Sequence, residues 1–110
     1  MIKNQIPQNL KECIIYIDNF VDLKYLGLNL NYCWIKRINY EYDCGAVLRK
    51  DWELTNKIPQ FFKDLHINDP MKISELAICA FFDYCKGNLP LYYWDEQKFL
   101  NEFLIKSIIE

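Results

Sequence analysis

The side chains that most often perform acid, base or nucleophilic chemistry are few in this sequence. Its single histidine, His66, ends the segment FFKDLHIN, and a histidine can serve as the base that activates a cysteine nucleophile. The cysteines are Cys13, Cys33, Cys44, Cys79 and Cys85. No local signature singles out one of them, and a histidine in the last turn of a helix has a structural role, because its cationic form interacts well with the helix C-terminus. We therefore predict no catalytic residue.

Metal and cofactor sites are also disfavoured by residue spacing. The five cysteines form an odd set without CxxC spacing, which argues against a disulfide framework and against a zinc ribbon. The phosphate-binding motifs GxGxxG and GxxxxGK followed by Ser or Thr do not occur in the sequence. The glycines of such motifs allow the backbone to come close to the phosphates of a nucleotide. We therefore expect no metal, no cofactor, and reduced thiols that are mostly buried.

Closely spaced carboxylates are the remaining candidates for acid–base chemistry. They are Asp18 with Asp22, Glu41 with Asp43, Asp51 with Glu53, and Asp95 with Glu96. Such a pair supplies an acid and a base only where burial or crowding raises the pKa of one member. The sequence gives no sign of that burial, so we interpret these residues as solvated surface charge.

The most distinctive cluster lies in INYEYDCGAVLRKDWE, residues 38–53. It interleaves aromatic rings with carboxylates, and its candidate partner-binding residues are Tyr40, Glu41, Asp43, Asp51, Trp52 and Glu53. Aromatic rings offer large, rigid contact areas, and carboxylates orient and attract a cationic partner. If this segment is a strand, its tyrosines and its first two carboxylates lie on opposite faces, so one flat patch does not use them all.

A second aromatic stretch is LPLYYWDEQKF, residues 89–99. Asp95 is the expected N-cap of a last helix, which places Trp94 and Phe99 at the two positions of a hydrophobic staple. The staple leaves Tyr92 and Tyr93 without a local role, so we add both to the candidate partner-binding residues. The sequence leaves open which tyrosine packs inward and which faces water.

Apolar periodicity predicts a mainly α fold. We expect one globular domain over residues 1–110, a small bundle of four to five helices around a buried helix near residues 70–86. That segment is apolar nearly all round, which is typical of a helix at the centre of a fold. Asp69 is its expected N-cap, Pro70 occupies its first position, and Gly87 is expected to close it in the left-handed conformation.

The other helices have weaker limits. A first helix is predicted from about residue 10 to 23, with Asn9 as N-cap, Glu12 as its capping-box partner and Gly27 as its stop. A helix of about two turns is predicted in IPQFFKDL, with Asn56 or Thr55 as its cap.

Residues 32–49 are ambiguous between a short β-hairpin and a helix. Apolar and polar residues alternate over much of this segment, as in a strand with one wet face, and the sequence is rich in aromatic residues. Gly45 would then mark a bulge or a bend. An α+β fold with this hairpin is therefore the alternative to an all-helical bundle.

Charge and hydropathy restrict the partners. The chain has 15 acidic and 13 basic residues, for a net charge of −2, and the basic residues are scattered, whereas direct binding of nucleic acid normally needs a basic patch. The start, MIKNQIPQNLKE, has polar residues where a signal peptide has an apolar core, and the longest apolar run, residues 76–82, is too short to span a bilayer. We expect a cytoplasmic protein with no direct contact to nucleic acid or membrane.

These observations favour a small protein-binding module. We predict an inhibitor of the immunity or antitoxin type, which neutralises a basic toxin, for example a nuclease, by covering its active site. In size and charge the chain resembles bacterial immunity proteins in general, an analogy of composition alone. The alternatives are a small enzyme with a cysteine or carboxylate in a pocket beside His66, and a homodimeric adaptor whose aromatic loop lies at a two-fold axis. The oligomeric state is left open.

Overall fold

The described part of the chain is helical. The computed structural model describes residues 5–20, 45–87 and 89–109. The helices in these ranges are α1 (Leu10–Phe20), α3 (Ala46–Asp51), α4 (Gln60–Asp64), α5 (Pro70–Gly87) and α6 (Glu96–Ile109), and the 3-10 turn η3 (Leu91–Tyr93) precedes α6. No strand occurs within these ranges. The prediction of a mainly α fold is confirmed.

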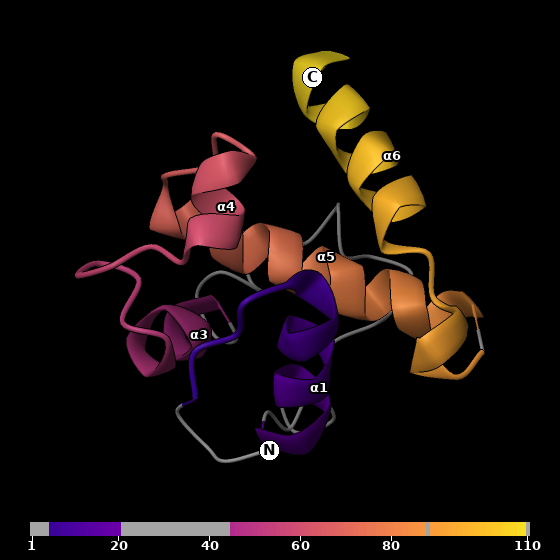
Figure 1. The fold of residues 1–110 in the computed structure, drawn as a ribbon, viewed down its shortest axis with the longest axis horizontal. Helices are drawn as coiled ribbons and strands as arrows, with labels where there is room; N and C mark the ends of the chain where they lie inside the picture. The colour runs from indigo at the N-terminus through magenta and orange to yellow at the C-terminus, as the bar shows by residue number, and fades with distance from the viewer. Residues whose placement is uncertain (1–4, 21–44, 88, 110) are drawn as a thin grey trace.

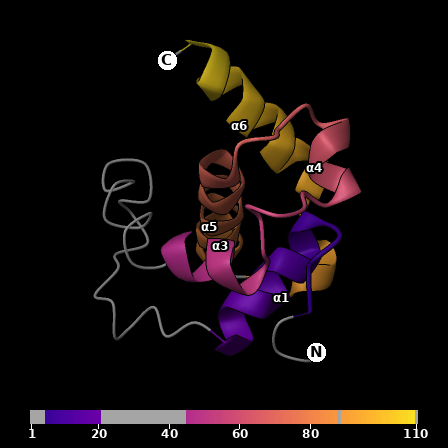
Figure 2. The same ribbon diagram turned by 90° about the vertical axis from the view of Figure 1, so that its left-hand side faces the viewer.

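Helix α5 is the centre of the arrangement. It runs through the middle of the molecule in Figure 1, and the view in Figure 2 shows α1, α3, α4 and α6 around it. Every residue from Ile73 to Phe82 is buried, which confirms the predicted core helix. Its N-terminus is capped as expected, because Asp69 Oδ1 accepts the N–H of Met71 at 3.0 Å. Gly87 is its last residue, but φ of Gly87 lies outside the left-handed region, so the predicted closing conformation is wrong.

Helix α1 packs on α5 through a buried stripe. The stripe consists of Leu10, Cys13, Ile14 and Ile17, with Tyr16 beside it. Asn9 is the N-cap, since its Oδ1 accepts the N–H of Glu12 at 2.9 Å. The Glu12 carboxylate accepts the side-chain amide of Asn9 at 3.1 Å, rather than the backbone N–H that a capping box uses. The predicted extension to residue 23 and the stop at Gly27 lie outside the described residues.

The hairpin alternative is wrong where the structure describes that segment. Residues 46–49 belong to α3, and Gly45 has helical dihedral angles, with φ −60° and ψ −40°, instead of forming a bulge. Leu48 and Trp52 are buried, whereas Ala46, which a strand would place on the same face, is exposed, so the period here is helical. Residues 32–44 lie outside the described part.

Helix α4 begins later than predicted and ends in a Schellman motif. Its N-cap is Pro59, so neither Asn56 nor Thr55 caps it. At the other end, the N–H of His66 donates to the carbonyl of Lys63 at 2.9 Å, and the N–H of Ile67 donates to the carbonyl of Phe62 at 3.0 Å. This pattern places His66 after the helix instead of in its last turn, with φ 60°.

Replacing His66 with glycine is expected to raise the free energy of unfolding by about 0.5–1 kcal/mol. The gain arises because the left-handed position at the end of α4 strains a residue that has a β-carbon, and His66 is exposed, so few contacts are lost. Urea unfolding followed by circular dichroism measures the change. His66→Ala is the matched control, since it removes the imidazole but keeps the β-carbon, and an equal gain in this variant would contradict the argument.

Candidate functional site

The predicted acidic and aromatic cluster is divided by the structure. Tyr40, Glu41 and Asp43 lie outside the described residues. Trp52 is 1% exposed and its ring meets the edge of Tyr16 with the centroids 5.4 Å apart. In this structure Trp52 therefore joins α3 to α1 in the core and offers no surface to a partner.

The two carboxylates of this cluster that are described have different surroundings. Asp51 is half-buried, and its Oδ2 accepts a hydrogen bond from the hydroxyl of Tyr16 at 2.7 Å. Glu53 is exposed and has φ 53°. Asp51 thus has a structural role between α1 and α3, whereas the carboxylate of Glu53 is accessible.

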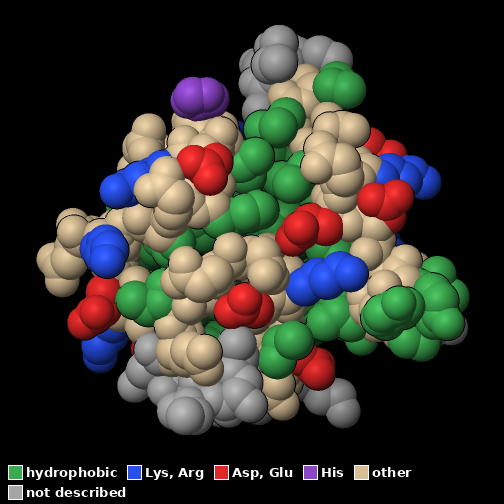
Figure 3. Space-filling model, in the orientation of Figure 1, with side chains coloured by type: hydrophobic (Ala, Val, Ile, Leu, Met, Phe, Trp, Pro, Cys, Tyr) green, Lys and Arg blue, Asp and Glu red, His purple; other side chains and the backbone are tan. Residues whose placement is uncertain are grey.

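Tyr92 and Tyr93 both face water. Their exposed fractions are 83% and 68%, and their rings meet edge to face with centroids 5.3 Å apart. Leu89, 58% exposed, lies three residues before Tyr92. Figure 3 shows hydrophobic side chains gathered over this turn between α5 and α6, at the right of the molecule. The turn presents the largest exposed aromatic side chains among the described residues.

The turn of residues 89–94, called the tyrosine turn below, is held by hydrogen bonds within its own backbone and by one from α1. The N–H of Tyr93 donates to the carbonyl of Pro90 at 2.9 Å, and the N–H of Trp94 donates to that of Leu91 at 3.0 Å. Lys11, from α1, reaches the carbonyl of Tyr92 at 3.5 Å. These contacts fix the backbone that carries the tyrosines while leaving their rings in solvent.

The predicted staple anchors the end of the turn. Trp94 is 8% exposed and packs on Phe99 with the ring centroids 5.6 Å apart. Asp95 caps α6, since its Oδ1 accepts the N–H of Lys98 at 3.0 Å. The N-terminus of α6 therefore has the local structure that the sequence predicts.

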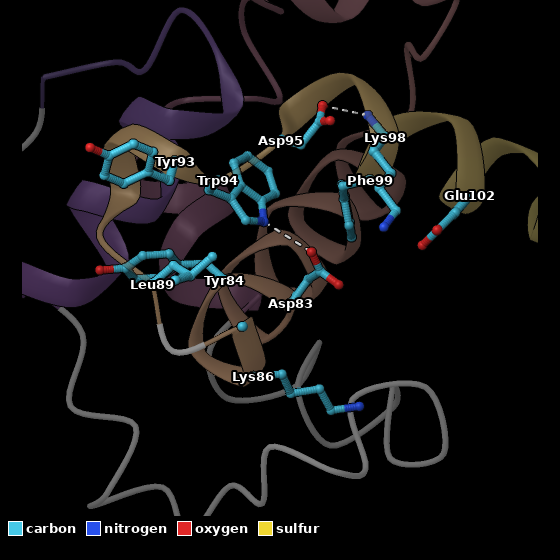
Figure 4. Close-up of a pocket in the computed structure, with 11 residues that line it drawn as sticks. Asp83, Tyr84, Lys86, Leu89, Tyr93, Trp94, Asp95, Lys98, Phe99 and Glu102 are labelled. Carbon is cyan, nitrogen blue, oxygen red and sulfur yellow. Dashed lines mark hydrogen bonds between the residues drawn. The ribbon is translucent and has the colours of Figure 1, made fainter.

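A groove of about 490 Å³ lies beside the turn. It runs between the C-terminal half of α5 and the start of α6, and its walls include Tyr84, Tyr93, Trp94 and Phe99. Figure 4 shows the indole N–H of Trp94 directed at Asp83, whose Oδ2 accepts it at 2.9 Å. Sequence reasoning missed this groove, because no local pattern shows that Trp94 and Asp83, eleven residues apart, form a hydrogen bond.

Both signs of charge surround the groove. Asp83, Lys86, Asp95, Lys98 and Glu102 line it and are exposed. Among the residues that the structure describes, no ion pair within 4.0 Å joins any of these side chains. Asp83 and Glu102 therefore retain unpaired carboxylate charge at the groove.

Two of the described thiols, those of Cys13 and Cys85, have a raised pKa. Burial raises the pKa of Cys13 well above its ordinary value, and the charges of Glu12 and Glu96 raise it further. Partial burial and the charge of Asp18 raise the pKa of Cys85. A cysteine nucleophile needs the opposite shift. Cys33 and Cys44, where activation was considered first, lie outside the described residues.

Native alkylation at pH 8 is expected to leave Cys13 unmodified and to modify Cys85 more slowly than in the unfolded chain. A raised pKa lowers the thiolate fraction at a given pH, so the rate at Cys85 should reach its plateau at a higher pH than that of an ordinary thiol. Iodoacetamide labelling from pH 7 to 10, read by peptide mass spectrometry with the urea-unfolded chain as control, measures this. Equal rates at Cys85 in the folded and unfolded chains would contradict the expectation.

Two further features, a metal-binding cluster and a membrane-spanning helix, are absent from the described ranges. There, no group of three or more His, Cys, Asp or Glu side chains is placed to hold a metal ion. No helix of that part of the chain combines the length and the apolar character needed to cross a membrane. His66 is exposed at the end of α4.

Comparison with known proteins identifies no relative. No family model, no curated protein and no solved structure matches the chain.

Proposed function

We propose that the chain is a protein-binding module, an inhibitor of the immunity or antitoxin type that covers the active site of a basic toxin such as a nuclease. The observation that carries this proposal is the exposed pair Tyr92 and Tyr93 on a turn fixed by hydrogen bonds. Such a pair has no packing role within the described structure. Its function is contact with another protein.

The geometry of the turn favours tight binding. A tyrosine ring brings a large apolar area with only two side-chain torsions to immobilise, and tyrosine is enriched among the residues that dominate binding energy. Because the hydrogen bonds at Pro90 and Leu91 already order the backbone, binding does not have to order it. An inhibitor needs a rigid complementary surface of this kind.

Charge supports a basic partner. The chain has a net charge of −2, and the exposed carboxylates of Asp83, Asp95 and Glu102 lie around the groove next to the tyrosines. Carboxylates that occupy the place of substrate phosphates attract the cationic active site of a nuclease and accelerate association. The three carboxylates outnumber Lys86 and Lys98 around the groove, and this excess supports a basic partner.

Replacing both tyrosines with alanine is expected to weaken capture of the partner at least about tenfold. The tagged full chain is used to capture proteins from its native host, and the captured protein is assayed for toxic or nuclease activity with and without the chain. Tyr92→Phe with Tyr93→Phe is the matched control, which keeps the ring area. Both double variants should unfold like the parent, because the two rings are exposed.

Two results would contradict the proposal. Capture that is unchanged in the alanine variant would remove the turn from the interface, and a captured protein that stays fully active would exclude inhibition. Burial of the same turn at a two-fold axis is the competing explanation, and sedimentation velocity distinguishes it. A dimer that the alanine variant converts to a monomer would favour the adaptor.

A further inference from the structure

The groove beside the tyrosine turn is lined by aromatic rings and by charged side chains. We propose that it receives an arginine side chain of the protein partner, with the guanidinium group against the aromatic wall and hydrogen-bonded to Asp83 and Glu102. This inference deepens the proposed function and rests on it. It adds the residue type that the partner inserts.

Asp83 is a fixed acceptor. Its Oδ2 accepts the indole N–H of Trp94 at 2.9 Å, and Trp94 is itself held at 8% exposure against Phe99. This bond fixes the orientation of the carboxylate and leaves Oδ1 open to the groove. A carboxylate oriented in advance loses little conformational freedom when it accepts a donor from a ligand.

Glu102 supplies the second unpaired carboxylate. It lines the same groove from α6, whereas Asp83 belongs to α5. In Figure 4 the side chains of Asp83 and Glu102 reach toward the same space. Asp95 accepts the backbone N–H of Lys98, and in Figure 4 its carboxylate points away from Asp83. Asp83 and Glu102 are therefore the two carboxylates that face the same part of the groove.

The aromatic wall favours a cation. Tyr84, Tyr93, Trp94 and Phe99 line the groove, and the face of an aromatic ring attracts cations and repels anions. Arginine is better suited than lysine because its planar guanidinium stacks on rings and presents several donors at once to carboxylates.

Two lysines at the groove favour an anionic ligand instead of a cation. Lys86 and Lys98 also line the groove, and both are exposed. Each ammonium group lies at the end of a flexible stem of four carbons and can move into solvent, whereas Asp83 is held in place by Trp94. Removing the charge of Lys98 should therefore strengthen binding of a cation and weaken binding of an anion.

The test uses the full chain and two short peptides that differ in one group. One is acetyl-Gly-Arg-Leu-Gly-amide, and the other carries citrulline, which is neutral and of nearly the same shape, in place of arginine. Binding is followed by NMR through the assigned indole N–H of Trp94, with the buried indole of Trp52 as the internal reference. We expect the arginine peptide to shift the Trp94 signal and to bind about tenfold more tightly than the citrulline peptide.

Three single variants test whether the carboxylates strengthen, and the lysine weakens, binding of the arginine peptide. Asp83→Asn and Glu102→Gln should each weaken binding of the arginine peptide about threefold, while Lys98→Gln should strengthen it by a similar factor. Asp83→Asn keeps an amide oxygen that can accept the indole N–H, so the groove retains its shape. Equal binding of the two peptides, or stronger binding in Asp83→Asn, would overturn the proposal.

The experiment separates this inference from the proposed function. A partner whose capture depends on Tyr92 and Tyr93, but not on Asp83 and Glu102, would keep the inhibitor and overturn the arginine site. Arginine-dependent shifts at Trp94, together with no loss of capture in the tyrosine variant, would retain the site and reject the tyrosine turn as the interface.

Discussion

Replacing Trp52 with alanine is expected to lower the free energy of unfolding by about 3–5 kcal/mol. Trp52 is 1% exposed, heads the largest fully buried side chains of the described core, and packs on Tyr16. Its removal leaves a cavity, and the short helix α3 carries few side chains that can move into it. Domains of this size are stable by about 5–15 kcal/mol, so the variant should lose a large share of its stability. Urea unfolding of parent and variant measures the difference.

Trp52→Phe is the informative control. The indole Nε1 of Trp52 is buried without a hydrogen-bond partner among the described residues, and an unpaired buried donor costs about 1–3 kcal/mol. Phenylalanine keeps most of the ring contact and removes that donor, so we expect its stability to stay within about 1.5 kcal/mol of the parent. A loss in Trp52→Phe as large as that in Trp52→Ala would contradict this expectation.

Replacing Glu96 with alanine is expected to lower the free energy of unfolding by about 2 kcal/mol. Glu96 Oε1 accepts the backbone N–H of Leu10 at 2.8 Å, which joins the first residue of α1 to the first residue of α6. Leu10 is fully buried, so its N–H would lose a charged acceptor where water has little access. The same substitution removes a negative charge from the N-terminus of α6, where the helix dipole favours it. Thermal and urea unfolding measure the loss.

Glu96→Gln separates the two contributions. Glutamine keeps an acceptor oxygen for the Leu10 N–H but removes the charge, so its loss should be less than about 1 kcal/mol. Asp95→Asn serves as a second control for the loss of negative charge at the N-terminus of α6. It removes a neighbouring charge, and asparagine is an equally good N-cap for this helix. A loss of stability in Glu96→Gln equal to that in Glu96→Ala would show that the charge, and not the bond to Leu10, is what matters.

Local features of the fold were predictable. The cap at Asp69 and the staple of Trp94 on Phe99 join residues no more than five positions apart. The residue types and the spacing needed for such contacts are visible in the sequence. The centre of α5 was predictable for a related reason, since a helix that is apolar on every side has no face to offer water.

Segment 45–51 shows where this reasoning fails. The alternation of apolar and polar residues left residues 32–49 ambiguous between a strand and a helix. Ala46, which a strand would place on the same face as Leu48 and Trp52, is exposed, whereas Leu48 and Trp52 are both buried. Tertiary packing of these two side chains decided between the two periods, and the pattern alone did not reveal it. The same burial removes Trp52 from the predicted surface.

The candidate site was predictable only in part. Tyr92 and Tyr93 stood out because the staple left them without a role, and both proved exposed. The groove was not foreseen, since it depends on the bond between Asp83 and Trp94, which joins two helical elements through a turn. Contacts of this kind are set by how helices pack, and a single sequence carries no mark of them.

The bond between Leu10 and Glu96 has a consequence for how the protein is made. The two residues are 86 positions apart, and a ribosome adds ~5–20 residues per second, so roughly 4–17 s separate their synthesis. Helix α1 also packs on α5, which is made late in the chain. The apolar stripe of the first helix therefore leaves the ribosome long before its docking surface exists. Until then its apolar side chains are exposed, and exposed apolar surface on an incomplete chain is prone to aggregation.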